Sequence, residues 1–470
     1  MITITRRLAQ QLRTVLRRAF GNFRSKGIAV GFIGDKAGLT VRSAFGDVAV
    51  ECRLPGERPA ETLWLPFEFL ADVGGKNDEP VELQAAGDNQ ISVQWNAGNV
   101  PHSVTYEATK PFEAKFPLLP TEFTANRPGL LQALHEASEV TAREGVRYAT
   151  NCLQLCPDGT INATDGCQLL IQSGFTFPWQ GAVLVPHNKV FTSPELPQEQ
   201  PVGIARSGDW VAVNAGRWTV FLRINDSRYP NVSSIIPNPD AAKARCQLSK
   251  DDIRFLVETL PALPCEEEDN RPVTIDLNGH VAIRARAADR ESKPTEVVLT
   301  NSRWTGEPIR INTNRTYLQR AMKLGLHDLC IHGEDTALLC QGFDRKFLWM
   351  PLKADSAIKP SDDAVRIESP AGEIAAPIPE TVTPRTVPPM SEPTNTTSQP
   401  DTTNPKTVRR KARQQDLAAL IDQAAQFRSA LHNLVQQSAG LVKALKQHRR
   451  QNRVIQNTLD SIKQLKTLGV

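Results

Sequence analysis

An arginine-rich segment near the N-terminus, residues 4–20, is the first part of the chain that could do chemistry. Drawn as an α-helix, it gathers leucine, valine and alanine on one side and its arginines on the two flanks. These are Arg6, Arg13 and Arg17 on one flank and Arg7 and Arg18 on the other. A row of guanidinium groups attracts phosphates without reading a base sequence. The same pattern is typical of a solvated helix face, so the segment alone leaves both interpretations open.

The sequence carries none of the common catalytic motifs beside these cations. It contains no GxxxxGK(S/T) phosphate loop, no HExxH pair and no GxSxG nucleophile elbow. Its eight cysteines form no CxxC pair and have no histidines near them at zinc-ligand spacing. We therefore expect a protein without enzymatic activity, cofactor or metal, whose cysteines are small buried hydrophobic side chains in a reducing cytoplasm.

Composition indicates a soluble protein of several domains. The 470 residues are 40% hydrophobic and 23% charged, and the longest apolar runs are too short to span a bilayer. The net charge is +4, but residues 406–470 carry 13 Lys/Arg against 3 Asp/Glu, a net of +10 that leaves −6 for residues 1–405. The basic excess therefore belongs to the tail. Residues 1–34 lack acidic side chains, so an organelle transit peptide is an alternative to a bacterial cytoplasmic protein.

One type of block recurs three times before residue 355. Each block opens with an amphipathic helical segment, and the openings begin at Ile4, Phe123 and Cys246, at offsets of 119 and 123 residues. Each continues with a strand, a turn and a second helix, at residues 63–73, 183–191 and 311–324. Alternating apolar and polar stretches around them predict half-buried strands. The fold class is therefore α+β, with two helices on antiparallel sheets in each of three tandem repeats. The expected repeats are residues 1–121, 122–241 and 242–354.

The strand and helix patterns stop at Lys353, and two different segments follow. Residues 355–408 form an expected disordered linker, because nine prolines between Pro370 and Pro405 stand among Ser, Thr, Asn and Glu. Residues 409–470 form an expected basic coiled-coil helix, because apolar residues return with a seven-residue period. A helical hairpin broken near Gly440 is the alternative for this tail. The seven-residue register continues through that glycine, which favours one long helix.

Several motifs resemble those of one protein family in order and spacing. The middle block reads GVRYATNCLQLCPDGTINATDGCQLLI from Gly145 and SRYPNVSSIIP from Ser227, the first contains LWLPFEFLADV and KFPLLP, and the third NRTYLQRAMKLGL and KFLWMPLK. Together they resemble the bacterial DNA polymerase III β subunit, the DNA sliding clamp, over residues 1–353. The resemblance implies three clamp repeats per chain, a head-to-tail ring dimer around duplex DNA, and polymerase and clamp-loader partners. The coiled-coil tail lies outside it.

The resemblance also implies which cations face the DNA. The implied residues are Arg6, Arg13 and Arg17 on the first helix, Arg24 and Lys26 in the following loop, and Arg143 in the matching central loop. The corresponding helix of the third repeat is acidic, with Asp251, Asp252 and Glu258. Pore charge is therefore expected to be uneven, and Arg315, Arg320 and Lys323 would have to compensate.

A second implied surface is a cleft for short partner peptides. The matching residues are Thr150, Thr164, Gly166, Cys167, Gln168, Leu169, Pro230, Ser234, Ile235, Leu348, Trp349, Met350, Pro351 and Leu352. Many family members have a His-Arg pair where Cys167 and Gln168 stand, and Trp349 is larger than the usual aliphatic residue. The preferred peptide is therefore expected to differ. The alternative is that these apolar residues are simply core.

Ring closure is the third implied feature, and the sequence departs from the family there. The matching edge strand lies around His102 and Val104 and follows Pro101, which removes a backbone donor and is usually tolerated only at sheet edges. The coiled coil could reinforce this contact or replace it. Two hypotheses follow: a processivity clamp that encircles DNA, and a divergent clamp paralogue that acts as a coiled-coil-assembled scaffold with little encirclement.

Overall fold

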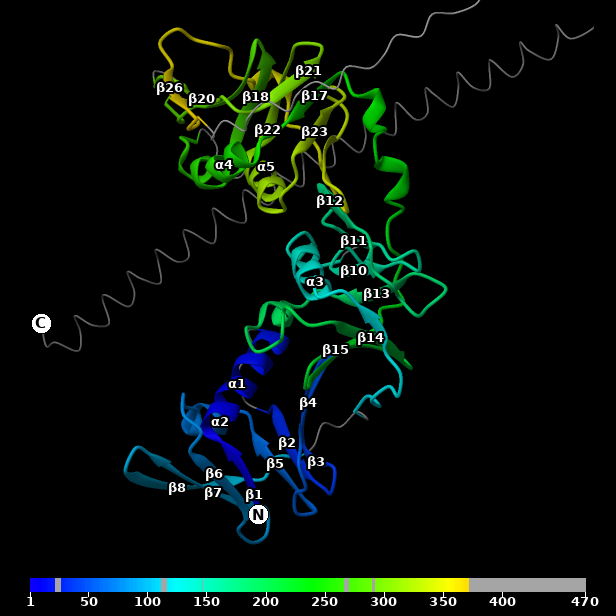
Figure 1. The fold of residues 1–470 in the computed structure, drawn as a ribbon, viewed down its shortest axis with the longest axis vertical. Coiled ribbons are helices and arrows are strands. Elements are labelled where there is room, and N and C mark those ends of the chain that lie inside the picture. Colours follow the sequence, from blue (N-terminus) through cyan, green and yellow to red (C-terminus); the bar gives the residue numbers. More distant parts are fainter. Residues whose placement is uncertain (22–26, 111–115, 146, 266–269, 290–291, 372–470) are drawn as a thin grey trace, which may run out of the picture. The chain divides into compact units, whose positions relative to one another are not determined.

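Five α-helices and four sheets make up the part of the chain that the structure describes (Figure 1). The structure is a computed structural model that describes residues 1–21, 27–110, 116–145, 147–265, 270–289 and 292–371. Its α-helices are α1 (Arg6–Phe20), α2 (Phe69–Val73), α3 (Leu130–Ser138), α4 (Lys250–Ala262) and α5 (Arg315–Lys323). Its 3₁₀ helices are η1 (Lys189–Thr192), η2 (Ser233–Ile235), η3 (Pro239–Ala241) and η4 (Ala354–Ser356). The mixture confirms the α+β class, with more strand than helix. None of the described helices is long and apolar enough to cross a membrane.

Two sheets contain the strands of the first expected repeat. The four-stranded sheet has the order β1-β6-β7-β8, with β1 (Ile2–Thr5), β6 (Pro80–Ala85), β7 (Gln90–Ala97) and β8 (Val100–Glu107). The eight-stranded sheet has the order β5-β2-β3-β4-β16-β15-β14-β9, with β5 (Glu61–Pro66), β2 (Ala29–Gly34), β3 (Gly38–Phe45), β4 (Val48–Pro55), β16 (Trp218–Arg223), β15 (Trp210–Ala215), β14 (Val202–Ser207) and β9 (Thr124–Asn126). The β4–β16 pairing therefore joins segments on either side of the expected boundary at residue 121.

Two further sheets contain the remaining strands. The nine-stranded sheet has the order β13-β10-β11-β12-β25-β24-β23-β17-β21, with β13 (Val183–Pro186), β10 (Cys152–Leu155), β11 (Ile161–Thr164), β12 (Gln168–Gln172), β25 (Arg345–Trp349), β24 (Leu338–Gln341), β23 (Asp328–Ile331), β17 (Ala244–Gln247) and β21 (Arg303–Gly306). The five-stranded sheet has the order β22-β18-β19-β20-β26, with β22 (Ile309–Asn314), β18 (Pro272–Asn278), β19 (His280–Ala285), β20 (Thr295–Leu299) and β26 (Val365–Glu368). The β12–β25 pairing crosses the expected boundary at residue 241.

The first helix of each expected block is shorter than its sequence pattern predicts. A strand takes up the beginning of each opening, β1 before α1, β9 before α3 and β17 before α4. In the first block, alternating Ile and Thr suits a strand with one buried face, and Ile2 and Ile4 are 0% and 3% exposed. Thr5 then caps α1 by accepting a hydrogen bond from the Leu8 N–H, 3.1 Å away. Strand-to-helix changes of this kind leave little trace in hydrophobic periodicity.

The second helical element follows the strand, turn and helix pattern that the sequence predicts. Strand β5 precedes α2, β13 precedes η1, and β22 precedes α5. The middle example is a single 3₁₀ turn, because Asn188 caps its start and Pro194 follows closely.

Ordered structure continues beyond Lys353, which corrects the prediction that it stops there. Helix η4 continues from the last residue of the third expected repeat into the expected linker, strand β26 lies within that linker, and Ser369 is 3% exposed. Alternation of Val365 and Ile367 with charged residues is a strand signal too short to distinguish it from a linker. The rest of that linker and the predicted coiled coil lie outside the described residues, as do Arg24 and Lys26.

Candidate nucleic-acid interface

Helix α1 turns its arginines outward because its apolar side is buried. The predicted apolar stripe is confirmed: Leu12, Val15 and Leu16 are at most 1% exposed. The helix ends at Gly21, whose φ of 72° suits glycine and whose N–H bonds to the Arg17 carbonyl oxygen. Burial of the stripe fixes the rotation of the helix, which leaves Arg13 half-buried and Arg17 exposed.

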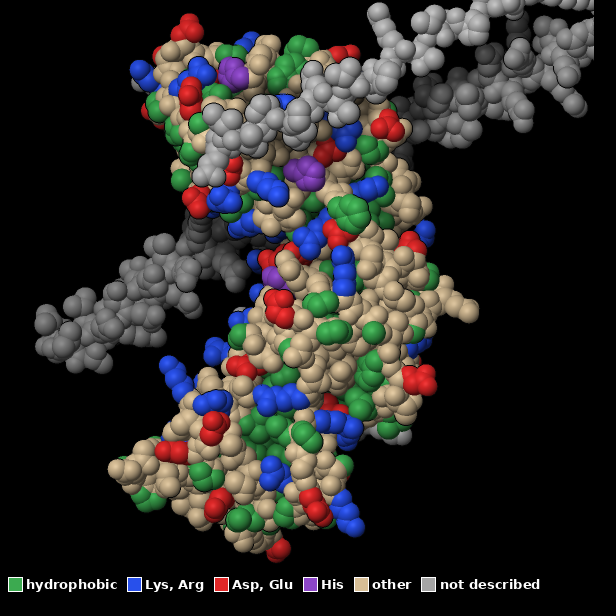
Figure 2. Space-filling model, in the orientation of Figure 1, with side chains coloured by type: hydrophobic (Ala, Val, Ile, Leu, Met, Phe, Trp, Pro, Cys, Tyr) green, Lys and Arg blue, Asp and Glu red, His purple; other side chains and the backbone are tan. Residues whose placement is uncertain are grey.

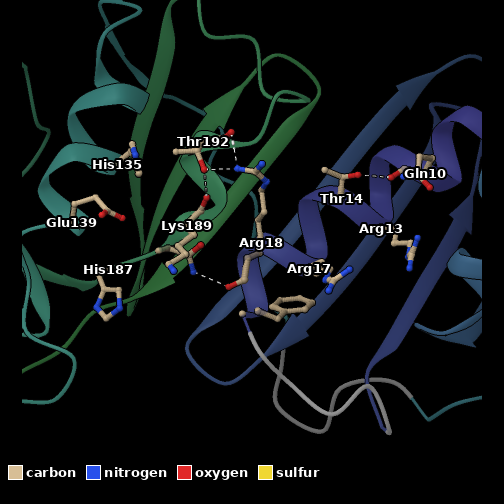
Figure 3. A pocket seen from close by; sticks show the side chains of 14 residues that line it. Gln10, Arg13, Thr14, Arg17, Arg18, His135, Glu139, His187, Lys189 and Thr192 are labelled. Atoms are coloured by element: carbon tan, nitrogen blue, oxygen red, sulfur yellow. Dashed lines mark hydrogen bonds between the residues drawn. The ribbon is translucent and has the colours of Figure 1, made fainter. Parts of the chain in front are cut away.

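A cavity of about 770 Å³ lies between α1 and the η1 and α3 segments, and we call it the basic groove (Figure 3). Its charged lining consists of four cations and one carboxylate. They are Arg13, Arg17, Arg18, Lys189 and Glu139. Figure 3 shows the arginines on one wall, with His135, Glu139 and His187 on the other. Figure 2 shows basic side chains over the same part of the molecule. The groove is therefore positive and suits an anionic ligand.

Hydrogen bonds lock the two walls of the basic groove together. The Asn188 side-chain amide donates to the Ala19 carbonyl oxygen at the end of α1, 2.8 Å away, and its carbonyl accepts from the Val190 N–H. Arg18 donates to the Thr192 carbonyl oxygen, 2.9 Å away. These bonds satisfy carbonyls that a helix end would otherwise leave open. The groove is therefore preformed, and Arg18 is partly used to hold its walls.

Three cations of the basic groove remain available to a ligand. Among the described residues, the side chains of Arg13, Arg17 and Lys189 have no hydrogen-bond or ion-pair partner. Burial lowers the pKa of His135, the Glu139 carboxylate opposes this, and Arg18 and Lys189 lower it further. His135 is therefore neutral near pH 7, and the permanent charge of the groove comes from its arginines and Lys189.

Arg6 does not belong to this surface, which corrects its prediction as a DNA-facing residue. Its guanidinium donates to the carbonyl oxygens of Val73 (3.2 Å), Gly74 (3.4 Å) and Asn96 (2.9 Å) and pairs with Glu79 (3.2 Å). Its side chain is 14% exposed. These bonds tie the start of α1 to the α2 and β7 segments. Helical periodicity groups Arg6 with the free arginines, but tertiary contacts use four of its five N–H donors.

A second cavity of about 410 Å³ lies on the other side of α3, against α5. His135 and Glu139 line both cavities, and Arg320 and Lys323 contribute positive charge to the second. Glu136 also lines it, so its charge is mixed. Arg320 donates to the Gln168 side-chain oxygen, 2.5 Å away, while Lys323 is exposed and has no partner among the described residues. The positive potential therefore weakens toward α5.

Arg315 is structural, which corrects the expectation that it compensates for the acidic α4. Its side chain is buried and donates to the carbonyl oxygens of Leu260, Leu263, Pro264 and Arg271. It thereby closes the C-terminal end of α4. Arg143 lies in the exposed loop after α3 and does not line the basic groove. The sequence also missed Lys189, His187 and Thr192, because the turn that carries them follows β13 and has no helical period.

Comparisons with known proteins agree with this architecture. The sequence matches no protein-family model and no curated protein. The Pseudomonas aeruginosa DNA polymerase III subunit beta is similar in structure, at 20% identity and a TM-score of 0.61, over 75% of this chain and 99% of that one. The beta chain from Streptococcus pneumoniae (15% identity, TM-score 0.62) and the beta subunit from Streptococcus pyogenes (13%, 0.63) cover the same shares. This chain has the sliding-clamp fold.

The clamp fold brings together the two segments of the predicted peptide cleft. Strands β12 and β25 pair so that Leu169 faces Leu348, and these are 1% and 2% exposed in a small apolar cluster with Val232. Thr164 supports the turn before β12 by accepting from the Gly166 N–H, 3.0 Å away. The cluster is thus core, as the alternative interpretation predicts for these two leucines.

The surface beside this cluster is apolar, and we call its exposed members the apolar patch. Ile235 is 57% exposed and Met350 is 49% exposed. Pro230, Pro351 and Leu352 are half-buried around the same segments, while Cys167 and Ser234 are exposed and Thr150 is half-buried. The Met350 N–H donates to the Cys167 carbonyl oxygen, 3.3 Å away, which joins the two segments.

Trp349 is buried on the opposite face of the nine-stranded sheet, which corrects its prediction as a cleft residue. It is 1% exposed and packs against Phe347, with ring centroids 5.3 Å apart. Its indole N–H donates to Thr313 Oγ1, 2.7 Å away. Side chains alternate along a strand, so Trp349 must face away from Leu348. Gln168 lies opposite Trp349 in the register and donates to Asp165, away from the apolar patch.

The predicted ring-closing strand, β8, is an exposed edge of the four-stranded sheet. Only Tyr106 along it is half-buried. His102 stacks on Trp95 with centroids 5.1 Å apart, and Val100 and Val104 are 57% and 39% exposed. Pro101 pairs with Asn96 inside the strand. The edge is therefore available to a further strand.

The described residues contain no cluster of His, Cys, Asp or Glu that could hold a metal ion. Five of the eight cysteines are buried, Cys156 and Cys265 are half-buried, and Cys167 is exposed. Burial raises the pKa of Cys52 to about 12 and that of Cys152 to about 11. Thiols with such pKa values are poor nucleophiles and behave as small apolar side chains.

Proposed function

We propose that this chain is a non-catalytic DNA clamp that binds duplex DNA in the basic groove without reading its sequence. The observation that carries the proposal is the set of unpaired cations, Arg13, Arg17 and Lys189, on walls fixed by hydrogen bonds. Preformed cations attract phosphates without the cost of ordering the site. The sliding-clamp fold of the chain also supports the proposal, because its structural neighbours are beta subunits of DNA polymerase III.

The wider proposal is a cytoplasmic bacterial processivity factor. Two copies would close a ring around DNA, a separate clamp loader would open it, and polymerases would dock on its surface. The three clamp repeats at residues 1–121, 122–241 and 242–354 would each contribute helices to the inner surface. Support comes from α1 and α3 lining one cavity and α3 and α5 lining the next.

Encirclement can be tested by comparing how the protein is retained on circular DNA and on the same DNA after it is cut. We expect the protein, loaded on nicked circular DNA with a clamp loader, to stay bound in high salt and to be lost when the circle is cut. The physical reason is that salt screens phosphate contacts, while a closed ring leaves only over a free DNA end. Gel filtration of the DNA complex before and after cutting measures this. Equal retention on circular and linear DNA would contradict encirclement but not groove binding.

The apolar patch is proposed as the docking site for partner peptides. Exposed Ile235 and Met350 lie beside a rigid core cluster, an arrangement that accepts an apolar anchor residue. Exposed Cys167 is uncharged where members of the family that the sequence resembles often carry a basic residue, so this surface lacks that charge. We therefore propose that the patch prefers less acidic peptides than the family usually binds.

Charge insertion tests the apolar patch. The probe is a short peptide with a Gln-Leu core, of the kind that the family's cleft binds. We expect Ile235→Glu and Met350→Glu each to weaken its binding by at least about tenfold, since each removes an apolar contact and buries a carboxylate on binding. Fluorescence anisotropy of the labelled peptide measures the change. Phe343→Glu is the control, because Phe343 is fully exposed on a different turn. Equal effects at all three positions would argue against a specific site.

A further inference from the structure

The last described segment, residues 354–371, forms an arm that we call the edge strap. The Asn312 side-chain amide donates to Ser356 Oγ, 2.6 Å away, and the Ile358 N–H donates to Thr274 Oγ1, 2.9 Å away. These contacts carry the strap over the polar face of the five-stranded sheet. Strand β26 then pairs with β20 in parallel, in a sheet whose other pairings are antiparallel (Figure 1). The strap therefore occupies the edge of β20 that would otherwise be open.

Backbone hydrogen bonds hold β26 in place. The Val365 N–H donates to the Pro294 carbonyl oxygen and the Ser369 N–H to that of Val298, both at 2.9 Å. Alternation along a strand then directs the Ile367 N–H toward β20 and the Arg366 N–H away from it. Ser369 also accepts from the Thr300 N–H, 2.9 Å away. The contact thus combines a short ladder of main-chain bonds with side-chain bonds at its end, where Thr300 Oγ1 donates to the Ser369 carbonyl oxygen (3.1 Å) and the Asn301 amide donates to that of Pro370 (2.8 Å).

The edge strap buries little apolar surface, so its attachment is weak. All of β26 is exposed, including Val365 at 54% and Ile367 at 37%. Among its apolar side chains, Ile358 alone is buried, at 8%. Segments with few buried apolar contacts open at low free-energy cost. The strap can therefore be displaced by a strand that buries more apolar surface against β20.

Strand β8 has the properties of such a competitor. It is eight residues long, against four for β26, and it presents exposed Val100 and Val104. The Ala108 N–H bonds to the Asn89 carbonyl oxygen, which sets the alternation: the N–H groups of Ser103 and Thr105 face away from β7. Long exposed edges of this kind template pairing with another chain. Pro101 removes one outward donor but leaves these two.

Strand β26 itself is a poor edge for further pairing. It is short, carries the Arg366–Glu368 ion pair at 3.3 Å, and is followed by Pro370. Short strands, charges and prolines are the features that blunt sheet edges. The observations therefore indicate that β26 covers β20 and is not itself the strand on which another copy docks.

We propose that the edge strap covers β20 in cis and competes there with β8 of a second copy of this chain. The copies could then join only after the strap leaves β20, so ring closure would depend on strap release. The proposal rests on the proposed clamp function for its biological meaning, but its physical content is a competition between two strands for one sheet edge.

Hydrogen exchange of the full-length chain tests the competition. In the wild type we expect the Ser103 and Thr105 amides to exchange quickly at all protein concentrations. Ile367→Pro removes a bond to β20, and we expect it to free β26 and to slow those two β8 amides by about tenfold or more as protein concentration rises. Ser369→Pro is a second release variant that acts at the other end of the ladder. All variants keep residues 372–470, so any association through the tail is constant.

Arg366→Pro is the matched control, because its N–H faces away from β20. We expect it to leave both β26 and β8 as in the wild type. If the β8 amides are instead protected in the wild type at high protein concentration and lose that protection in Arg366→Pro, β26 is the docking strand and the proposal is overturned. The proposal would also be overturned if a release variant frees β26 but its β8 amides still exchange quickly at high protein concentration. It would be overturned as well if the β26 amides stay protected from exchange in the double variant Ile367→Pro, Ser369→Pro.

The proposed DNA function and this strand competition can be tested independently of each other. Substitutions in the basic groove should change DNA affinity and leave β8 exchange untouched, since no residue that lines the groove belongs to β8, β20 or β26. If the release variants behave as expected while no DNA is retained, the competition stands and the clamp function falls.

Discussion

Replacing both free arginines of α1, Arg13→Ala with Arg17→Ala, should lower the slope of log affinity for duplex DNA against log salt concentration by about two. Each arginine that binds a phosphate releases about one counterion, so two lost contacts remove about two ions from the equilibrium. The side chains have no partner in the described chain, so their loss should leave the fold intact. Affinity measured by fluorescence anisotropy over a salt series gives the slope.

Arg7→Ala is the matched control on the same helix. Arg7 pairs with Asp78 at 3.0 Å and donates to the Lys76 carbonyl oxygen, and it does not line the basic groove. Its loss should leave the slope close to that of the wild type. Adding Lys189→Ala to the double variant should lower the slope by about one more. A slope insensitive to Arg13 and Arg17, or equally sensitive to Arg7, would remove the groove as the DNA site.

The sequence could predict the parts of this site that depend on local periodicity. The buried stripe of α1 and the outward position of Arg13 and Arg17 follow from spacing alone. The same spacing groups Arg6 with them, and only the carbonyls of the α2 and β7 segments show that Arg6 is structural. Lys189 joins the groove through one buried amide, Asn188, bonded to α1 across 169 residues. No local pattern contains such a contact.

Sheet pairing sets the second limit on prediction. Trp349 belongs to an apolar run whose members alternate between the core and the apolar patch, and the pairing of β25 with β12 decides which residue faces where. The edge strap shows the same limit at the end of the fold. Four residues, VRIE, are too few to distinguish a strand from a linker, and the exposed backbone groups of β20 decide the outcome.

Arg284→Met should destabilise the five-stranded sheet by about 3–5 kcal/mol. Arg284 is 2% exposed, pairs with the Asp276 carboxylate, and donates from Nε to Glu296, 2.6 Å away. Its removal leaves two buried carboxylates with weaker partners, Arg310 at 3.1 Å from Asp276 and His280 at 3.8 Å from Glu296. An uncompensated buried charge costs far more than the ion pair contributes. Hydrogen exchange of the β19 amides against urea concentration measures the loss.

Two further variants separate buried charge from lost packing. Arg366→Met removes an arginine from an exposed ion pair with Glu368, and we expect a change below about 1 kcal/mol. Adding Asp276→Leu and Glu296→Met to Arg284→Met removes the stranded carboxylates, and most of the lost stability should return. If the triple variant is no more stable than Arg284→Met, the cost lies in packing of the guanidinium stem. Recovery of stability in the triple variant would show that β20 is stabilised by the neutralisation of buried charges on the polar face of the sheet, which the edge strap crosses.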